Sequence, residues 1–287
     1  MKELTARASL FSQIEAGHSF WSKEIFEFGP LYVYEKLLSG SYGPSKHEKL
    51  ISALQSTSGE RVLETISAQG AHFLTPQDLE WPVQLNDLNY PPIALVVKGN
   101  TEVLKIPSLA IVGTRNPTNY GARIAGDFAA GFVDREWAIV SGGAYGIDSY
   151  AHKGALIAEG ITIAIIACGV DINYPAGNAR LFSEICESGA IVSEFMPGQK
   201  ALPNRFLTRN RLIAGLSKAT LVVEAAFRSG SLRTARDAAE IFRPVMAIPG
   251  AINSPTSEGC HRLIGERSAE IVTSVADAVE FVGVHSG

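Results

Sequence analysis

The sequence predicts an α/β protein with a mostly parallel sheet that helices cover on both faces, preceded by a small helical domain. Three observations support this prediction. From residue 108 onward, short and continuously apolar runs alternate with helical stretches, which is typical of strands buried on both faces. Residues 1–80 instead place apolar side chains at helical spacing. The length of 287 residues is enough for one large domain and one small one.

The first 80 residues contain four stretches with apolar side chains at helical spacing, each ending near Gly or Ser. They are LFSQIEAG, GPLYVYEKLLSG, HEKLISALQS and GERVLETISAQG. We assign residues 1–80 to a small helical domain. Residues 81–92 hold three prolines and several turn formers, so we interpret them as a linker. Residues 93–287 then form the α/β domain.

The predicted strands of this domain are apolar runs, most of them separated by helical stretches such as FLTRNRLIAGLS and SGSLRTARDAAEIF. The strand-forming runs are ALVVKG, SLAIVGT, WAIVSGG, ITIAIIACG, AIVSEF, ATLVVEAA and PVMAIPG.

Composition excludes several classes of protein. The longest nearly apolar run, Ile161 to Val170, has ten residues, whereas a membrane-spanning helix needs about 20. The N-terminus lacks the apolar segment of a signal peptide, and three distant cysteines without a CxxC favour a reducing, cytoplasmic location. Six scattered histidines offer no metal-ligand spacing, so we expect no metal and no cofactor.

The charge is unevenly distributed. The net charge of −4 taken alone argues against a basic nucleic-acid-binding protein. Residues 205–243, however, carry eight basic and three acidic side chains, a local net charge of +5. One segment of an acidic protein is therefore basic.

Three loops follow predicted strands with small residues and a helix start. They are Gly113-Thr114-Arg115, the loop that begins Ser141-Gly142-Gly143, and Arg228-Ser229-Gly230-Ser231. Ligands of open parallel sheets bind at the carboxyl ends of the strands, where such loops bring backbone N–H groups close to an anion. Each loop alone is also compatible with a tight turn or a helix N-cap. The sequence SGGAYGID is neither GxGxxG nor a Walker A loop, so it predicts no nucleotide cofactor.

The basic segment begins with Arg205-Phe206-Leu207-Thr208-Arg209-Asn210-Arg211. Arginines beside an aromatic ring supply the phosphate contact and the stacking platform that single-stranded nucleic acid requires. Residue types alone rather favour the alternative, in which Phe206 is a core residue and the arginines form a solvated helix face.

Candidate catalytic groups are few. Asp148 and His152 stand at i, i+4 with Lys153 next, and Glu224 ends an apolar strand. An Asp–His pair can perform acid–base chemistry, but it more often caps or pins a helix. Glu224 is compatible with a functional carboxylate or with a partner for Arg209 or Arg211.

These motifs, taken in order, resemble the DNA processing protein A (DprA or Smf) family. The matching segments are Gly113–Arg115, Ser141–Asp148, Ala151–Leu156, Cys168–Asp171 with Tyr174-Pro175, Arg209–Ser217, Val222–Ala225, Ser229–Leu232, Ile248–Gly250 and Ser257–Ile264. The resemblance extends from about Tyr90 to Ile264, and the block RNRLIAGLS…SGSLRTA is highly specific.

The resemblance implies a Rossmann-like domain after a small helical (SAM-like) domain. It also implies a non-enzymatic, homodimeric protein that binds single-stranded DNA and helps load the RecA recombinase in natural transformation or recombination. With the loop residues above, it predicts DNA- and phosphate-binding residues. They are Gly113, Thr114, Arg115, Ser141, Gly142, Gly143, Lys153, Arg205, Phe206, Arg209, Asn210, Arg211, Ser229, Gly230 and Ser231.

The sequence departs from the family pattern at two points. Tyr145 stands where many members have Arg, so one basic contact is missing or replaced by stacking. Only about 20 residues follow Ile264, too few for the winged-helix domain that many members carry, so we expect none.

The main alternative is a nucleotide-processing enzyme that would use Glu224 beside Ser229–Ser231. The PGGxGTxxE block of one such family is absent, and this chain has SGSLRTARDAAE instead. A pure protein-interaction module is a further alternative, but it leaves the basic segment unexplained.

Overall fold

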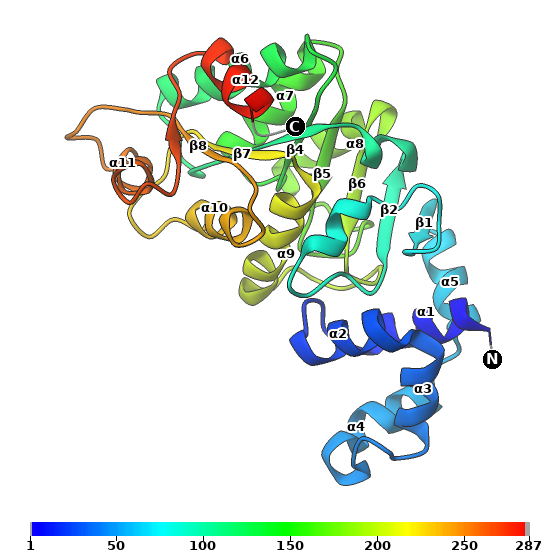
Figure 1. Cartoon of the computed structure of the whole chain (residues 1–287). Coiled ribbons are helices and arrows are strands. Elements are labelled where there is room, and N and C mark those ends of the chain that lie inside the picture. Colours follow the sequence, from blue (N-terminus) through cyan, green and yellow to red (C-terminus); the bar gives the residue numbers. More distant parts are fainter. Residues whose placement is uncertain (1, 285–287) are drawn as a thin grey trace.

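A single mixed sheet organises the protein, in a computed structural model that describes residues 2–284 (Figure 1). Its strand order is β1-β2-β6-β5-β4-β3-β7-β8-β9. β2 pairs antiparallel with β1 and β6, and the pairs from β6 to β9 are parallel, which confirms the predicted α/β, Rossmann-like fold. The strands are β1 (Ala71–Leu74), β2 (Leu95–Gly99), β3 (Ser108–Val112), β4 (Ala138–Ser141), β5 (Thr162–Ile165), β6 (Ala190–Ser193), β7 (Ala219–Val222), β8 (Val245–Ala247) and β9 (Glu270–Ile271).

Helices bury both faces of the central strands, which explains why those strands are continuously apolar. In β3, Leu109 and Ile111 pack on one face, while Ala110 and Val112 pack on the other. One face carries α6 (Asn119–Val133), α7 (Ile147–Ile157), α8 (Ala179–Ser188) and α12 (Val275–Val284). The other carries α9 (Pro203–Leu216), α10 (Ser231–Glu240) and α11 (Glu258–Gly265).

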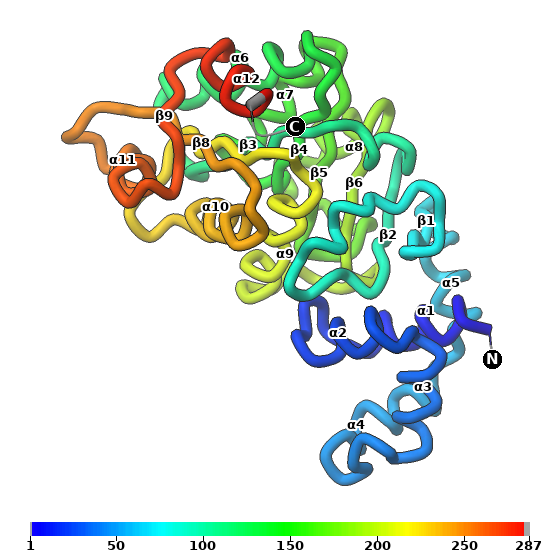
Figure 2. Tube along the Cα trace, in the orientation of Figure 1, coloured from blue at the N-terminus to red at the C-terminus, as the bar shows by residue number. Residues whose placement is uncertain are grey.

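The N-terminal helices lie below the sheet, drawn in blue in Figures 1 and 2, and share one apolar core cluster with its strands and α8. They are α1 (Glu3–Gln13), α2 (Ser19–Phe28), α3 (Pro30–Leu38), α4 (Pro44–Gln55) and α5 (Gly59–Ser67). Leu10, Val33 and Leu37 are fully buried between them. The start of α5 is capped by Ser58, whose hydroxyl accepts a hydrogen bond from the Arg61 N–H. This confirms the predicted helical region.

Two segments near the junction are more ordered than the sequence suggests. β1 lies inside the range 1–80 and pairs with β2, so it belongs to the sheet. The segment 81–92, interpreted as a linker, contains a 3₁₀ helix, η1 (Val83–Asp87), and buries Trp81 and Leu85 in the core. We propose that the α/β domain begins near Ala71.

The buried helices and strands of the described structure are short. Within residues 2–284, no helix has both the length and the hydropathy required to cross a bilayer.

Candidate nucleic-acid interface

The sheet has a topological switch point at β3. This strand pairs with β4 on one side and with β7 on the other, so the chain leaves β3 and β7 in opposite directions. A cavity of about 700 Å³ lies at their carboxyl ends. Gly113–Arg115 line it from the β3 side and Arg228–Ser231 from the β7 side. The third predicted loop reaches the same cavity through Ala144 and Asp148, so all three loops meet at one site.

Helix α9 forms a further wall of this cavity. Its positions 206, 209 and 210 lie on one helical face because residues three and four apart are neighbours on a helix. Phe206, Arg209 and Asn210 all line the cavity. The Asn210 amide nitrogen donates a hydrogen bond to the Gly230 carbonyl at 3.2 Å, which ties α9 to the loop after β7.

An aromatic and cationic stack stands at the cavity. The Arg115 guanidinium lies over the Phe206 ring, with 5.3 Å between Cζ and the ring centroid. The Tyr174 ring centroid lies 5.5 Å from that of Phe206, and the two rings are tilted by 50°. Arg115 and Tyr174 are exposed and Phe206 is half-buried, so the stack has open ring and guanidinium surface. The aromatic rings can stack on a nucleic-acid base, and the guanidinium can bind its phosphate.

Tyr174 and Arg228 line the cavity although they are not among the site residues predicted from the sequence. Tyr174 has a sequence signal, because it belongs to the Tyr174-Pro175 motif in the loop after β5. Arg228 opens the loop Arg228–Ser231 and is exposed. Both could have been found by including every aromatic and basic side chain in the loops at this edge of the sheet.

Arg209 supplies a buried positive charge beneath the opening. Its Nη1 donates to the Ile165 carbonyl at 2.7 Å. Burial lowers the pKa of Arg209 to about 10, with the nearby Asp148 carboxylate opposing the shift, so the side chain is cationic at neutral pH. Burial also raises the pKa of Asp148, while the charge of Arg209 opposes that rise. Within the described residues, the charged groups lining the cavity are three arginines and Asp148.

The loop Ser141–Gly143 lies buried beside this cavity and does not line it. The Gly142 N–H donates to Asp148 Oδ2 at 3.1 Å, and the Ala144 N–H donates to the same oxygen at 3.4 Å. The Ser141 hydroxyl donates to the Ile111 carbonyl at 2.6 Å. The side chain of Asp148 thus occupies the anion position that this loop offers. A direct DNA contact by Ser141, Gly142 and Gly143 stays a prediction.

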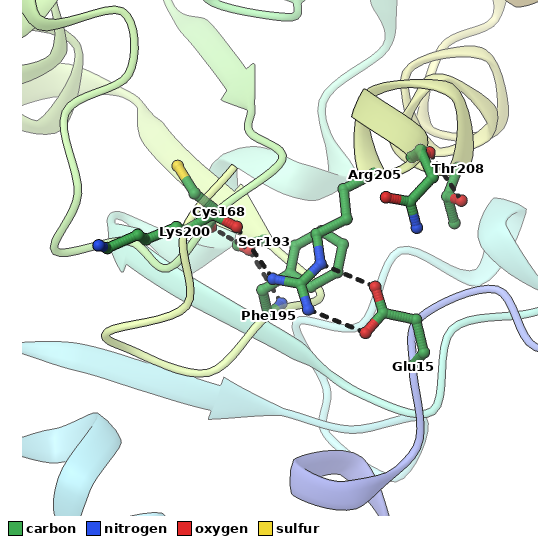
Figure 3. Close-up of polar contacts among 8 residues, drawn as sticks. Glu15, Cys168, Ser193, Phe195, Lys200, Arg205 and Thr208 are labelled. Atoms are coloured by element: carbon green, nitrogen blue, oxygen red, sulfur yellow. Dashed lines mark hydrogen bonds and ion pairs between the residues drawn. The ribbon is translucent and has the colours of Figure 1, made fainter. Parts of the chain in front are cut away.

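Arg205 and Arg211 are held by carboxylates. Figure 3 shows Arg205 facing Glu15, to which Nε and Nη2 donate at 2.7 and 2.9 Å. The Arg211 Nη2 lies 2.7 Å from both carboxylate oxygens of the buried Glu194. Neither arginine lines the cavity. Their predicted DNA contacts would require these ion pairs to open.

The remaining predicted residues lie in two places. Ser229 and Ser231 line the cavity, and their hydroxyl oxygens are 2.7 Å apart. Lys153 lies on the exposed side of α7, with Nζ 5.8 Å from the Tyr150 ring centroid, and lines a different cavity.

The Glu224 side chain stabilises the start of a helix. Its carboxylate accepts hydrogen bonds from the Thr118 N–H at 2.9 Å and the Thr118 hydroxyl at 2.6 Å, which anchors the start of α6. It is buried and does not line the cavity. In residues 2–284, no group of three or more His, Cys, Asp and Glu side chains is arranged to hold a metal ion.

The sequence of this chain is similar to a known protein family and to several of its members. Residues 72–283 match the family model described as DNA recombination-mediator protein A. The chain is 39% identical over 268 residues to the putative DNA processing protein DprA of Mycobacterium tuberculosis, covering 89% of this chain and 69% of that protein. It is 43% identical over 199 residues to DprA of Streptococcus pneumoniae, covering 69% and 70%.

Two solved structures are similar across most of the chain. The X-ray structure of DprA from Streptococcus pneumoniae matches with a TM-score of 0.83 and 34% identity, covering 98% of both chains. DprA from Helicobacter pylori matches with a TM-score of 0.67 and 31% identity, covering 75% of this chain and 94% of that one. The latter structure is described as giving insight into a single-stranded DNA binding mode.

Proposed function

This chain belongs to the DNA recombination-mediator protein A (DprA/Smf) family, and on that premise we propose that it binds single-stranded DNA in the cavity at the carboxyl ends of β3 and β7. The proposed role is that of a non-catalytic recombination mediator. The observation that carries the proposal is the stack of Arg115, Phe206 and Tyr174 at a cavity lined by three arginines.

The arrangement suits a single strand better than a duplex. Phe206 and Tyr174 present ring faces, which stack only on bases that are not already stacked within a duplex. Arg115 and Arg228 are exposed at the same cavity and suit phosphate oxygens. Contacts to ring faces and backbone carry little sequence information, so we expect weak sequence preference.

We extend the proposal to loading of a RecA-type recombinase on the bound strand and to assembly as a homodimer. Support comes from the family description as a recombination mediator and from similarity to DprA proteins. Mixing the protein with RecA, single-stranded DNA and a single-strand-binding competitor tests the first part. Faster filament assembly is expected, and an unchanged rate would contradict it. A solution mass equal to twice the chain mass is expected for the second part.

The alternative of a nucleotide-processing enzyme receives less support. It needs Glu224 to act beside Ser229–Ser231, whereas its carboxylate is bound to Thr118. Incubation with nucleoside monophosphates separates the two proposals, because release of free base would favour the enzyme.

The decisive experiment measures affinity for an oligo-dT over a range of salt concentrations. The logarithm of the association constant should fall by about 0.7 per log unit of salt for each phosphate neutralised. Arg115→Ala should weaken binding and reduce that slope, because it removes both a phosphate partner and the cation over Phe206.

Lys218→Ala is the matched control. Lys218 is exposed and directly precedes β7, so it lies at the amino end of that strand, away from the cavity at its carboxyl end. It belongs to the same basic segment, residues 205–243. It should leave the slope unchanged. The proposal fails if the protein does not bind at low salt, or if Arg115→Ala and Lys218→Ala behave alike.

A further inference from the structure

A second cavity lies beyond the loop that follows β5. It has a volume of about 440 Å³ and is lined in part by Gly177, Asn178, Lys153 and Arg180. The same loop contributes Tyr174 to the first cavity. The segment 174–178 therefore separates two cavities, each of which contains basic side chains.

Tyr145 stands between the two cavities. Its hydroxyl oxygen accepts a hydrogen bond from the Gly177 N–H at 3.2 Å, and Gly177 lines the second cavity. The preceding residue, Ala144, lines the first. A Cβ at position 177 would lie 2.5 Å from the Tyr145 hydroxyl oxygen, so glycine at this position lets the ring pack against the loop. The Tyr145 side chain is nevertheless 49% exposed.

The aromatic residues continue past Tyr145 to a basic end. Tyr150, near the start of α7, is 43% exposed. The Lys153 Nζ lies over its ring at 5.8 Å from the centroid, because positions 150 and 153 are neighbours on the helix. Single exposed aromatic side chains are common on protein surfaces. Here Tyr145 contacts the loop that borders both cavities, and Tyr150 contacts Lys153, which lines the second cavity.

We propose that a single strand bound in the first cavity continues over Tyr145 into the second cavity. Bases would stack on Tyr145 and Tyr150, and Lys153 would contact a phosphate. This inference rests on the proposed function and adds the path of the strand to it. It also assigns a role to Tyr145, which stands where many family members have an arginine. Lys153, which does not line the first cavity, receives a role as well.

The test compares a short oligonucleotide, dT2, with a long one, dT20, by fluorescence anisotropy at fixed salt. The short strand should occupy the first cavity alone, so Tyr145→Ala should change its affinity less than twofold. The affinity for dT20 should fall by roughly 5- to 100-fold, as expected for the loss of a stacked base. Tyr150→Ala and Lys153→Ala should show the same dependence on length.

Two control variants define the readout. Tyr145→Phe keeps the ring and loses only the hydroxyl, so its affinity for dT20 should stay near that of the wild type. Tyr32→Ala removes a ring of similar exposure from the distant helix α3 and should change neither affinity. Arg115→Ala should weaken binding of both oligonucleotides.

The outcomes separate the two proposals. If Tyr145→Ala, Tyr150→Ala and Lys153→Ala bind dT20 like the wild type while Arg115→Ala binds weakly, the extended path is wrong and the first site stands. If Arg115→Ala also binds like the wild type, or if the wild type binds neither oligonucleotide, both proposals are overturned.

Discussion

Arg205 on α9 and Glu15, after α1, form a two-pronged ion pair that joins the helical bundle to the α/β domain, with Nε–Oε1 at 2.7 Å and Nη2–Oε2 at 2.9 Å (Figure 3). The guanidinium also lies over the Phe195 ring, 4.6 Å from its centroid, and Nη1 donates to the Lys200 carbonyl. The next residue of α9 is Phe206, which lines the cavity. The helical bundle is thus attached to the helix that forms a wall of the proposed DNA site.

Arg205→Ala tests whether this pair holds the two parts together. The Arg205 side chain is 10% exposed and Glu15 is 47% exposed, so solvent screens the pair partly. We expect the free energy of unfolding to fall by about 1–2 kcal/mol, measured by urea denaturation. The slope of DNA affinity against salt should stay unchanged, because in this arrangement Arg205 meets a carboxylate and not a phosphate.

A double-mutant cycle with Glu15→Ala supplies the control. The two single substitutions and the double substitution should give a coupling energy of about 1 kcal/mol. A salt slope that drops by about 0.7 in Arg205→Ala would show instead that Arg205 neutralises a phosphate. That result would support the contact predicted from the sequence.

The fold could be predicted from the sequence because strands buried on both faces are apolar throughout, as β3 is. The cavity loops could be predicted because parallel strands bring their carboxyl ends to one edge. The placement of Phe206 and Asn210 at the cavity needed the family resemblance, since residue types alone favoured a core position for Phe206. Strand β1, with four residues, was too short to stand out from the neighbouring helices.

The distant partners of three basic residues could not be predicted, because a charge count over one segment ignores carboxylates elsewhere in the chain. Three of the eight basic side chains in residues 205–243 form ion pairs with carboxylates outside that segment in the described structure: Arg205–Glu15, Arg211–Glu194 and Arg243–Asp87. Arg233 pairs with Asp237, which the count of +5 already includes. Glu15 is 190 positions away from Arg205 along the chain. The local charge of +5 therefore overstates the free positive charge, which at the cavity comes from Arg115, Arg209 and Arg228.

His152 makes stability depend on pH. The Thr162 hydroxyl donates its proton to the Ile139 carbonyl at 2.8 Å, so its oxygen can only accept from His152. The neutral His152 ring therefore carries its proton on Nδ1, which donates to that oxygen at 2.6 Å. Burial, with a contribution from Arg209, lowers the pKa of His152 from 6.5 to about 3. Below pH 6.5 the unfolded chain therefore binds a proton that the folded chain does not, and stability falls as the pH falls toward 3.

We expect this group to cost about 2 kcal/mol of unfolding free energy between pH 7 and pH 5. His152→Asn is the comparison, because its amide nitrogen can replace Nδ1 as donor to Thr162 while the side chain does not titrate. The difference between wild type and variant in urea denaturation should shift by that amount across the interval. A difference that is constant with pH would show that the pKa of His152 is the same in the folded protein as in the unfolded chain.

Gly142→Ala tests how the buried cation is held at the cavity. A Cβ at this position would lie 2.6 Å from Cζ of Arg209, within the space that the guanidinium occupies. Arg209 is buried and its Nη1 is bound to the Ile165 carbonyl, so it cannot move aside without losing that hydrogen bond. We expect a loss of about 2–4 kcal/mol in unfolding free energy from overpacking and the broken bond. Weaker oligo-dT binding should accompany it, because a cation of the cavity wall is displaced.

Gly126→Ala makes the same chemical change where there is room for it. Gly126 lies within α6, and a Cβ there would meet no atom within 4 Å. Alanine at a helical position is favoured over glycine, so this variant should be as stable as the wild type or up to about 1 kcal/mol more stable. Equal stability and DNA affinity in the two variants would mean that the approach of Arg209 to Gly142 has no bearing on either property. A loss confined to Gly142→Ala would tie the glycine of the loop after β4 to the position of the Arg209 charge.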